Sequence, residues 1–165
     1  MNIILKSTPR KYENMMDELV PLLLDLLKKI DLLEQEIFVR DEALKKEKPA
    51  LNIPRSQVHP KWNELMDEYS TRFEHLIDGR VSEKLRSRGY AGSFGNPGEY
   101  YYANSGEFSA EFTMRKESMA SVIIHYGKAL KMKHKFVLRL IDGVWVIDEK
   151  YYGFEGEKTW YLHRI

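Results

Sequence analysis

The stretch 135–153, KFVLRLIDGVWVIDEKYYG, contains two apolar runs joined by Asp142-Gly143. An Asp-Gly pair provides the positive φ angles that a two-residue type I′ turn needs, so the stretch predicts a β-hairpin. Counting outward from the turn predicts the pairs Ile141 with Val144, Leu140 with Trp145, Leu138 with Ile147, and Val137 with Asp148. We therefore expect Trp145 in the core and Asp148 at the surface.

The first strand of this hairpin alternates between two faces from residue 130 to residue 141. One face is apolar except for His134, and the other bears Lys131, Lys133, Lys135 and Arg139, which we call the lysine face. Asp148 points to the same side in the predicted register. Lysines at such positions either guard a strand against edge-to-edge pairing or form a patch that binds a partner. The candidate partner-binding residues are therefore Lys131, Lys133, Lys135, Arg139 and Asp148.

Helical periodicity precedes this region. Apolar residues recur every three or four positions over 9–48 and again from Pro60 to Gly79, and a short helix is predicted over 81–88. Three prolines and the loss of any period over 45–60 indicate a linker. The predicted parts are an N-terminal helical segment with its linker, 1–57, and an α+β domain, 58–165, which together form one compact unit.

After Gly89 the apolar period changes from helical spacing to two. Alternating residues predict strands over 107–114, 119–127 and 158–164, in addition to the hairpin. Helices followed by a run of strands are typical of α+β proteins. We expect N-terminal helices packed on one face of a strongly curved antiparallel sheet.

Composition narrows the classes of partner. Lys plus Arg total 26 against 25 Asp plus Glu, so no overall field attracts nucleic acid. The chain has no cysteine, which excludes disulfides and thiol catalysis and suits a reducing compartment. Charged residues interrupt the most apolar stretch, 19–33, and the first residues lack a signal-peptide core. We expect a cytoplasmic protein with no nucleic-acid or membrane partner.

The sequence contains no strong motif for metal binding, phosphate binding or catalysis. The five histidines show no metal-ligand spacing, and the glycine-rich 89–98 lacks the Gly-Lys-Ser/Thr ending of a phosphate loop. No serine has the strand-turn-helix context of a nucleophile. His134 fits a hydrogen-bonded histidine of the core or of a pocket rim better than a general base. We predict no catalytic, metal or cofactor-binding residues, no cofactor, and a protein that is not an enzyme.

Four segments occur in a distinctive order over about residues 58–165: HPKWNELMDEYSTRF, RSRGYAGSFGNPGEYYY, FVLRLIDGVWVIDEKYYG and KTWYL. Together they resemble the bacterial immunity-protein family with a nuclear transport factor two fold, which belongs to polymorphic toxin systems. The resemblance implies a cystatin-like cone of helices on a bent sheet, and direct binding of a cognate toxin protein that protects the producing cell. The helix before residue 50 lies outside the resemblance, and we assign it to toxin contact or to a homodimer.

Two other functions remain open. The same fold serves small-molecule-binding proteins and enzymes like ketosteroid isomerase or the polyketide cyclases, which hold a carboxylate, histidine or tyrosine inside the cone. On the predicted apolar face of the hairpin His134 is the only titratable group, so a filled interior is expected. A structural oligomer built through the N-terminal helix is the other alternative.

Overall fold

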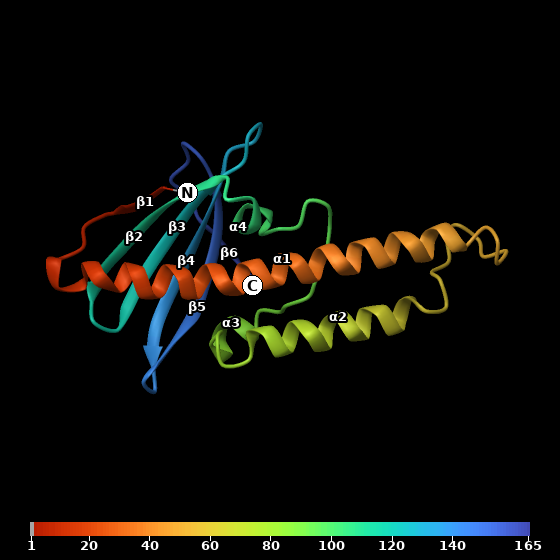
Figure 1. Ribbon diagram of the computed structural model, residues 1–165, viewed down its shortest axis with the longest axis horizontal. Coiled ribbons are helices and arrows are strands. Elements are labelled where there is room, and N and C mark those ends of the chain that lie inside the picture. Colours follow the sequence, from red (N-terminus) through yellow and green to blue (C-terminus); the bar gives the residue numbers. More distant parts are fainter. Residues whose placement is uncertain (1) are drawn as a thin grey trace.

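The computed structural model describes residues 2–165 (Figure 1). The helices are the 3₁₀ helix η1 (Arg10–Met15), α1 (Met16–Glu47), α2 (Trp62–Ile77), α3 (Glu83–Arg86) and α4 (Tyr101–Ser105). The strands are β1 (Asn2–Leu5), β2 (Phe108–Lys116), β3 (Met119–Tyr126), β4 (Met132–Ile141), β5 (Val144–Phe154) and β6 (Tyr161–His163). The predicted α+β class is confirmed, and β1 and α4 are additions to the predicted elements.

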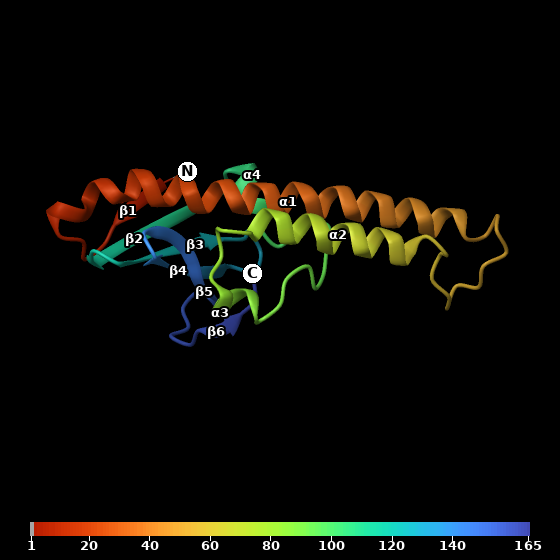
Figure 2. The same cartoon turned by 90° about the horizontal axis from the view of Figure 1, so that it is seen from below.

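The N-terminal half of α1 runs across one face of the sheet, and α2 lies antiparallel to the C-terminal half of α1, mainly beyond the sheet (Figures 1 and 2). The apolar stripe of α1, including Leu23 and Leu26, is fully buried in the same core as Phe112 of β2 and Phe136 of β4. Burying this stripe against the sheet stabilises a helix that its own propensity alone would leave marginal. The helix before residue 50 is therefore an integral part of the core.

The six strands lie in the order β1-β2-β3-β4-β5-β6, and the sheet is not closed into a barrel. Strands β2 to β6 pair antiparallel, whereas β1 pairs parallel to β2. The prediction of a wholly antiparallel sheet is wrong. Strand β1 precedes the helices and β2 follows them, and a long helical crossover of this kind permits parallel pairing.

The β4–β5 hairpin follows the predicted register at three pairs, Ile141 with Val144, Leu140 with Trp145, and Leu138 with Ile147. The fourth predicted pair is wrong, because Val137 pairs with Glu149 and Asp148 is left as an extra residue. One extra residue is a β-bulge, which reverses the alternation of side chains beyond it. Lys150 consequently lies opposite Phe136 and points into the core, where a regular register would have placed it opposite Lys135.

Trp145 is half-buried and packs against the core from its edge, so its predicted position in the core is only partly right. The tip of the hairpin extends past the helices in Figure 1. Leu140, which pairs with Trp145, is 38% exposed for the same reason. The core side of the hairpin is instead closed by Leu138 and Ile147, both 0% exposed.

Candidate functional site

The alternation of β4 places the lysine face on the side of the sheet opposite to the buried side chains of His134, Phe136 and Leu138. Lys133 and Lys135 are half-buried there, and both ammonium groups stack on the ring of Trp160, at 4.5 Å and 5.1 Å from its centroid. Lys135 also lies 4.8 Å from the ring centroid of Tyr151. Cation–π contacts of this kind hold the ammonium groups in place while leaving their charge available. We call Lys133, Lys135, Tyr151 and Trp160 the lysine-aromatic patch.

Within residues 2–165, neither Lys133 nor Lys135 forms an ion pair with a carboxylate. The ammonium of Lys133 donates to the backbone carbonyl of Glu157 at 2.7 Å. The patch thus combines two positive charges with two aromatic rings on a sheet face. Tyr and Trp rings are enriched at the centres of protein interfaces. The two lysines add positive charge beside those rings, which steers an acidic partner.

The structure separates Arg139 and Asp148 from that patch. Asp148 is 4% exposed, so the prediction of a surface position is wrong, although its side chain does point toward Arg139. Its carboxylate accepts from Arg139 Nε at 2.6 Å and lies 3.2 Å from Lys84 Nζ. Burial alone would raise the pKa of Asp148, but hydrogen bonds from Ser82, Lys84 and Arg139 outweigh it and lower the pKa. The Asp148 carboxylate links Lys84 of α3 to the bulge. Asp148 and Arg139 are thus paired within the chain and are not free to bind a partner.

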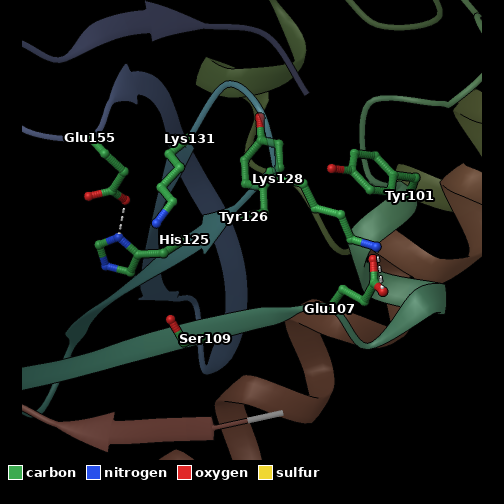
Figure 3. A pocket seen from close by; sticks show the side chains of 9 residues that line it. Tyr101, Glu107, Ser109, His125, Tyr126, Lys128, Lys131 and Glu155 are labelled. Carbon is green, nitrogen blue, oxygen red and sulfur yellow. Dashed lines mark hydrogen bonds and ion pairs between the residues drawn. The ribbon is translucent and has the colours of Figure 1, made fainter.

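Lys131 lies just before β4 at the edge of a second surface feature, a hollow of about 500 Å³ (Figure 3). An ion pair between Glu107 and Lys128, at 3.1 Å, and a hydrogen bond between His125 and Glu155 lie at this hollow. Lys131 is exposed. The five candidate partner-binding residues therefore fall into three environments rather than one: the hollow, the lysine-aromatic patch and the bulge.

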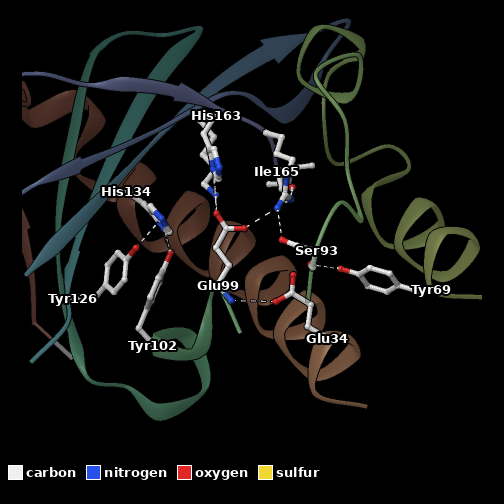
Figure 4. Close-up of polar contacts among 11 residues, drawn as sticks. Glu34, Tyr69, Ser93, Glu99, Tyr102, Tyr126, His134, His163 and Ile165 are labelled. Carbon is white, nitrogen blue, oxygen red and sulfur yellow. Dashed lines mark hydrogen bonds and ion pairs between the residues drawn. The ribbon is translucent and has the colours of Figure 1, made fainter. Parts of the chain in front are cut away.

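A cluster of buried charges, not predicted from the sequence, lies on the opposite face of the sheet (Figure 4). Lys150 is 0% exposed and donates to the carboxylate of Glu99, which is also 3.1 Å from His163 Nδ1. Burial alone would raise the pKa of Glu99, but His163 and Lys150 outweigh it and hold the pKa below its usual range. Burial lowers the pKa of Lys150 to about 8, against the attraction of Glu99.

Glu34 of α1 extends this cluster into the helix layer. It is 2% exposed, and its carboxyl group accepts the backbone N–H of Glu99 at 3.2 Å. Burial is the main reason that the pKa of Glu34 rises to about 7, and the nearby charge of Glu99 adds to it. A Cβ at position 98 would lie 2.8 Å from Glu34 Oε2 and 2.9 Å from Asp31 Oδ1, so the two buried carboxyl groups would have to move to accept any residue other than glycine.

His134 is 2% exposed and bonded on both ring nitrogens, to the hydroxyl of Tyr102 at 2.9 Å and to that of Tyr126 at 2.8 Å. Burial holds the pKa of His134 well below its usual value, so the ring is neutral. The prediction of a hydrogen-bonded histidine of the core or of a pocket rim is confirmed. A hollow of about 380 Å³ opens beside it, between the 97–101 turn and the ends of β3, β4 and β5.

Sequence reasoning missed Glu34, Glu99 and Lys150 for identifiable reasons. Lys150 turns inward because of the bulge, and Glu99 follows a loop whose path the sequence does not specify. Glu34 did carry a signal, because it occupies a position between the apolar residues Leu33 and Ile37 of α1, near the buried stripe.

No group of three His, Asp or Glu side chains within residues 2–165 is placed to hold a metal ion. None of the helices over that range combines the length and the apolar character needed to cross a membrane. The lysine-aromatic patch, the buried cluster and the hollow beside His134 are the features from which a function can be argued. Comparison of the chain with protein-family models, with curated proteins and with solved structures finds no match.

Proposed function

We propose that this chain is a cytoplasmic immunity protein that neutralises a cognate bacterial toxin by direct binding, on a cone of the nuclear transport factor two type. The lysine-aromatic patch carries the proposal. It holds two unpaired lysine charges over Trp160 and Tyr151 on the sheet face that the helices leave open. An acidic surface of the toxin would gain both charge complementarity and aromatic contacts there.

The order of the elements and the sequence resemblance over about residues 58–165 support the same function. The two other parts of the predicted binding set contribute less. Arg139 and Asp148 neutralise each other. Asp148 also pairs with Lys84 of α3, so the role of the pair is to fix α3 against the bulge. Lys131 adds a further positive charge at the edge of the hollow lined by His125 and Glu155.

Coexpression with the protein encoded immediately upstream, where the toxin of an immunity protein is expected, tests the proposal. We expect the chain to restore growth and to copurify with intact toxin in a stoichiometric complex. Replacing Lys133 and Lys135 by Glu should weaken that complex. Rescue accompanied by degradation or chemical modification of the toxin, with no stable complex, would contradict inhibition by binding.

The main alternative is a small-molecule-binding protein or an enzyme on the same fold. The observation in its favour is the hollow of about 380 Å³ beside His134, with Glu99 and His163 among its lining residues. Its neighbouring charges are already paired, Lys150 with Glu99 above all. An enzyme would turn over a substrate in the absence of the toxin, whereas an immunity protein would not.

A further inference from the structure

The hollow beside His134 is walled mainly by rings. Its lining includes Tyr101, Tyr126, Tyr152, Met132, His134 and His163, and its volume is about 380 Å³. This volume lies at the lower end of the range of roughly 300 to 1,000 Å³ for small-molecule sites. Tyr101 and Tyr126 meet edge to face at 6.1 Å, and Tyr152 meets His163 edge to face at 5.1 Å. The shape suits a small planar molecule.

The hydrogen bonds of His134 determine where the donors of this hollow point. A neutral imidazole has one N–H donor and one acceptor nitrogen. Tyr102 is 0% exposed, and among the described residues His134 Nδ1 is the only hydrogen-bond partner of its hydroxyl. An unmatched buried hydroxyl proton is costly, so Tyr102 must donate to Nδ1. Nδ1 is then the acceptor, and Nε2 carries the proton.

With the proton on Nε2, His134 donates to the hydroxyl oxygen of Tyr126. Tyr126 then keeps its own proton, for which no acceptor exists among the described residues, and its side chain lines the hollow. We propose that this hollow binds a small, uncharged, planar molecule through a carbonyl-type oxygen that accepts a hydrogen bond from Tyr126. Tyr102, which does not line the hollow, and His134, which does, position that donor.

The charge of the ligand follows from the pairing around Glu99. The carboxylate of Glu99 is occupied by Lys150 and His163, so a cationic ligand would find no free anion. Lys150 is 0% exposed and bonded to Glu99, so an anionic ligand would find no free ammonium there. Burial also raises the pKa of the Tyr126 hydroxyl, which therefore stays protonated and acts as a donor. The hollow therefore suits an uncharged ligand that accepts a hydrogen bond.

This site does not depend on the proposed toxin-binding function. Alternation along β4 places His134 on the helix side of the sheet, and Lys133 and Lys135 on the other side. An experiment can therefore contradict one of the two proposed sites and still support the other. Charge reversal at Lys133 and Lys135 should leave ligand binding unchanged.

Titration of ¹⁵N-labelled protein with acetophenone, followed by NMR, tests the site. We expect saturable shifts at Tyr101, Tyr126 and Tyr152 with a dissociation constant in the millimolar range. Benzoate and benzyltrimethylammonium carry the same ring with opposite charges, and both should bind at least about tenfold more weakly. Absence of saturable acetophenone binding, or tighter binding of either charged probe, would overturn the proposal.

Two further measurements separate the hydroxyl of Tyr126 from general packing. Tyr126→Phe keeps the ring and should weaken acetophenone binding about three- to tenfold, the effect of one lost hydrogen bond. Tyr161→Phe is the matched control, because Tyr161 stacks behind Tyr152 outside the hollow, and it should keep the wild-type affinity. The ¹⁵N shifts of His134 in the wild-type protein should show a protonated Nε2 and a bare Nδ1. The opposite tautomer would refute the assignment even if a variant failed to fold.

Discussion

At the scale of single residues, the bulge gives Asp148 a structural role. Its buried carboxylate is shared by Arg139 and Lys84, and Ser82 caps α3 next to it. We expect Asp148→Ala to lower the free energy of unfolding by about 1 to 3 kcal/mol, because hydrogen bonds to buried charged groups are lost. Urea denaturation monitored by tryptophan fluorescence measures the change.

Glu149 provides the control for Asp148. Glu149 contacts the same two bases but is more exposed, with 18% of its side chain accessible against 6% for Asp148. Glu149→Ala should therefore cost less than half as much stability, as expected for a partly exposed pair. Equal losses from the two substitutions would show that burial at the bulge is not what strengthens the Asp148 pair.

The raised pKa of Glu34 predicts how the free energy of unfolding depends on pH. Its pKa is raised from 4.5 in the unfolded chain to about 7 in the fold, so the folded state binds the proton more tightly. The resulting stabilisation is fully present below pH 4.5 and is lost as the pH rises through 7. A shift of this size corresponds to up to about 3 kcal/mol. Urea denaturation between pH 5 and pH 8 should show the loss.

Glu34→Gln should remove most of this loss, because the amide is neutral at every pH. Glu36→Gln changes an exposed position on the same helix and should retain the wild-type pH profile. The difference between the two variants isolates Glu34 from other groups that titrate in this range. Parallel pH profiles for wild type and Glu34→Gln would mean that another group is responsible.

At the scale of the elements, the turn before α4 depends on close contact with α1. A methyl group at position 98 would lie within 2.9 Å of buried oxygens of both Glu34 and Asp31. We expect Gly98→Ala to destabilise the protein by about 1 to 3 kcal/mol, as for overpacking in a core. In the same turn, a Cβ at Gly95 would only reach Pro97 O at 3.6 Å, an ordinary contact. Gly95→Ala should therefore have little effect on the thermal midpoint, and similar losses at 95 and 98 would contradict this account.

The sequence predicted most of the elements, and two of the five candidate partner-binding residues, Lys133 and Lys135, lie in the lysine-aromatic patch. The Asp142-Gly143 turn, the strands from 107 onward and both long helices follow from apolar periodicity, which local sequence determines. The parallel pairing of β1 depends on a contact between residues about 100 positions apart, which no local pattern encodes. The bulge is a second such case, and it moved Asp148 out of register and Lys150 into the core. The Glu99–Lys150 pair could not be predicted without it.

At the scale of the whole molecule, the sheet separates two kinds of chemistry. Its helix side holds a paired set of ionisable groups around Glu99 and places the hydroxyl of half-buried Tyr126 beside a hollow. Its open side presents Lys133 and Lys135 on aromatic rings with no carboxylate partner within residues 2–165. Surface charges of this kind affect association more than folding.

The lysine-aromatic patch should control the rate at which the chain associates with the toxin. Lys133→Glu combined with Lys135→Glu should slow association and reduce its dependence on salt, because the patch attracts the partner before contact. The thermal midpoint should fall modestly, since the variant loses the cation–π contacts and the hydrogen bond from Lys133 to Glu157 O but no ion pair with a carboxylate within residues 2–165. Stopped-flow measurements at two ionic strengths give the association rate and its dependence on salt.

The control for this variant is Lys28→Glu combined with Lys46→Glu, which changes the net charge equally at exposed positions of α1. If the lysine-aromatic patch is the docking surface, this control should associate at nearly the wild-type rate. If the lysines serve only to prevent edge pairing, both variants should bind alike, and threonines at 133 and 135 should instead promote aggregation. Equal association rates for a soluble patch variant and its control would therefore exclude the lysine-aromatic patch as the toxin-binding surface.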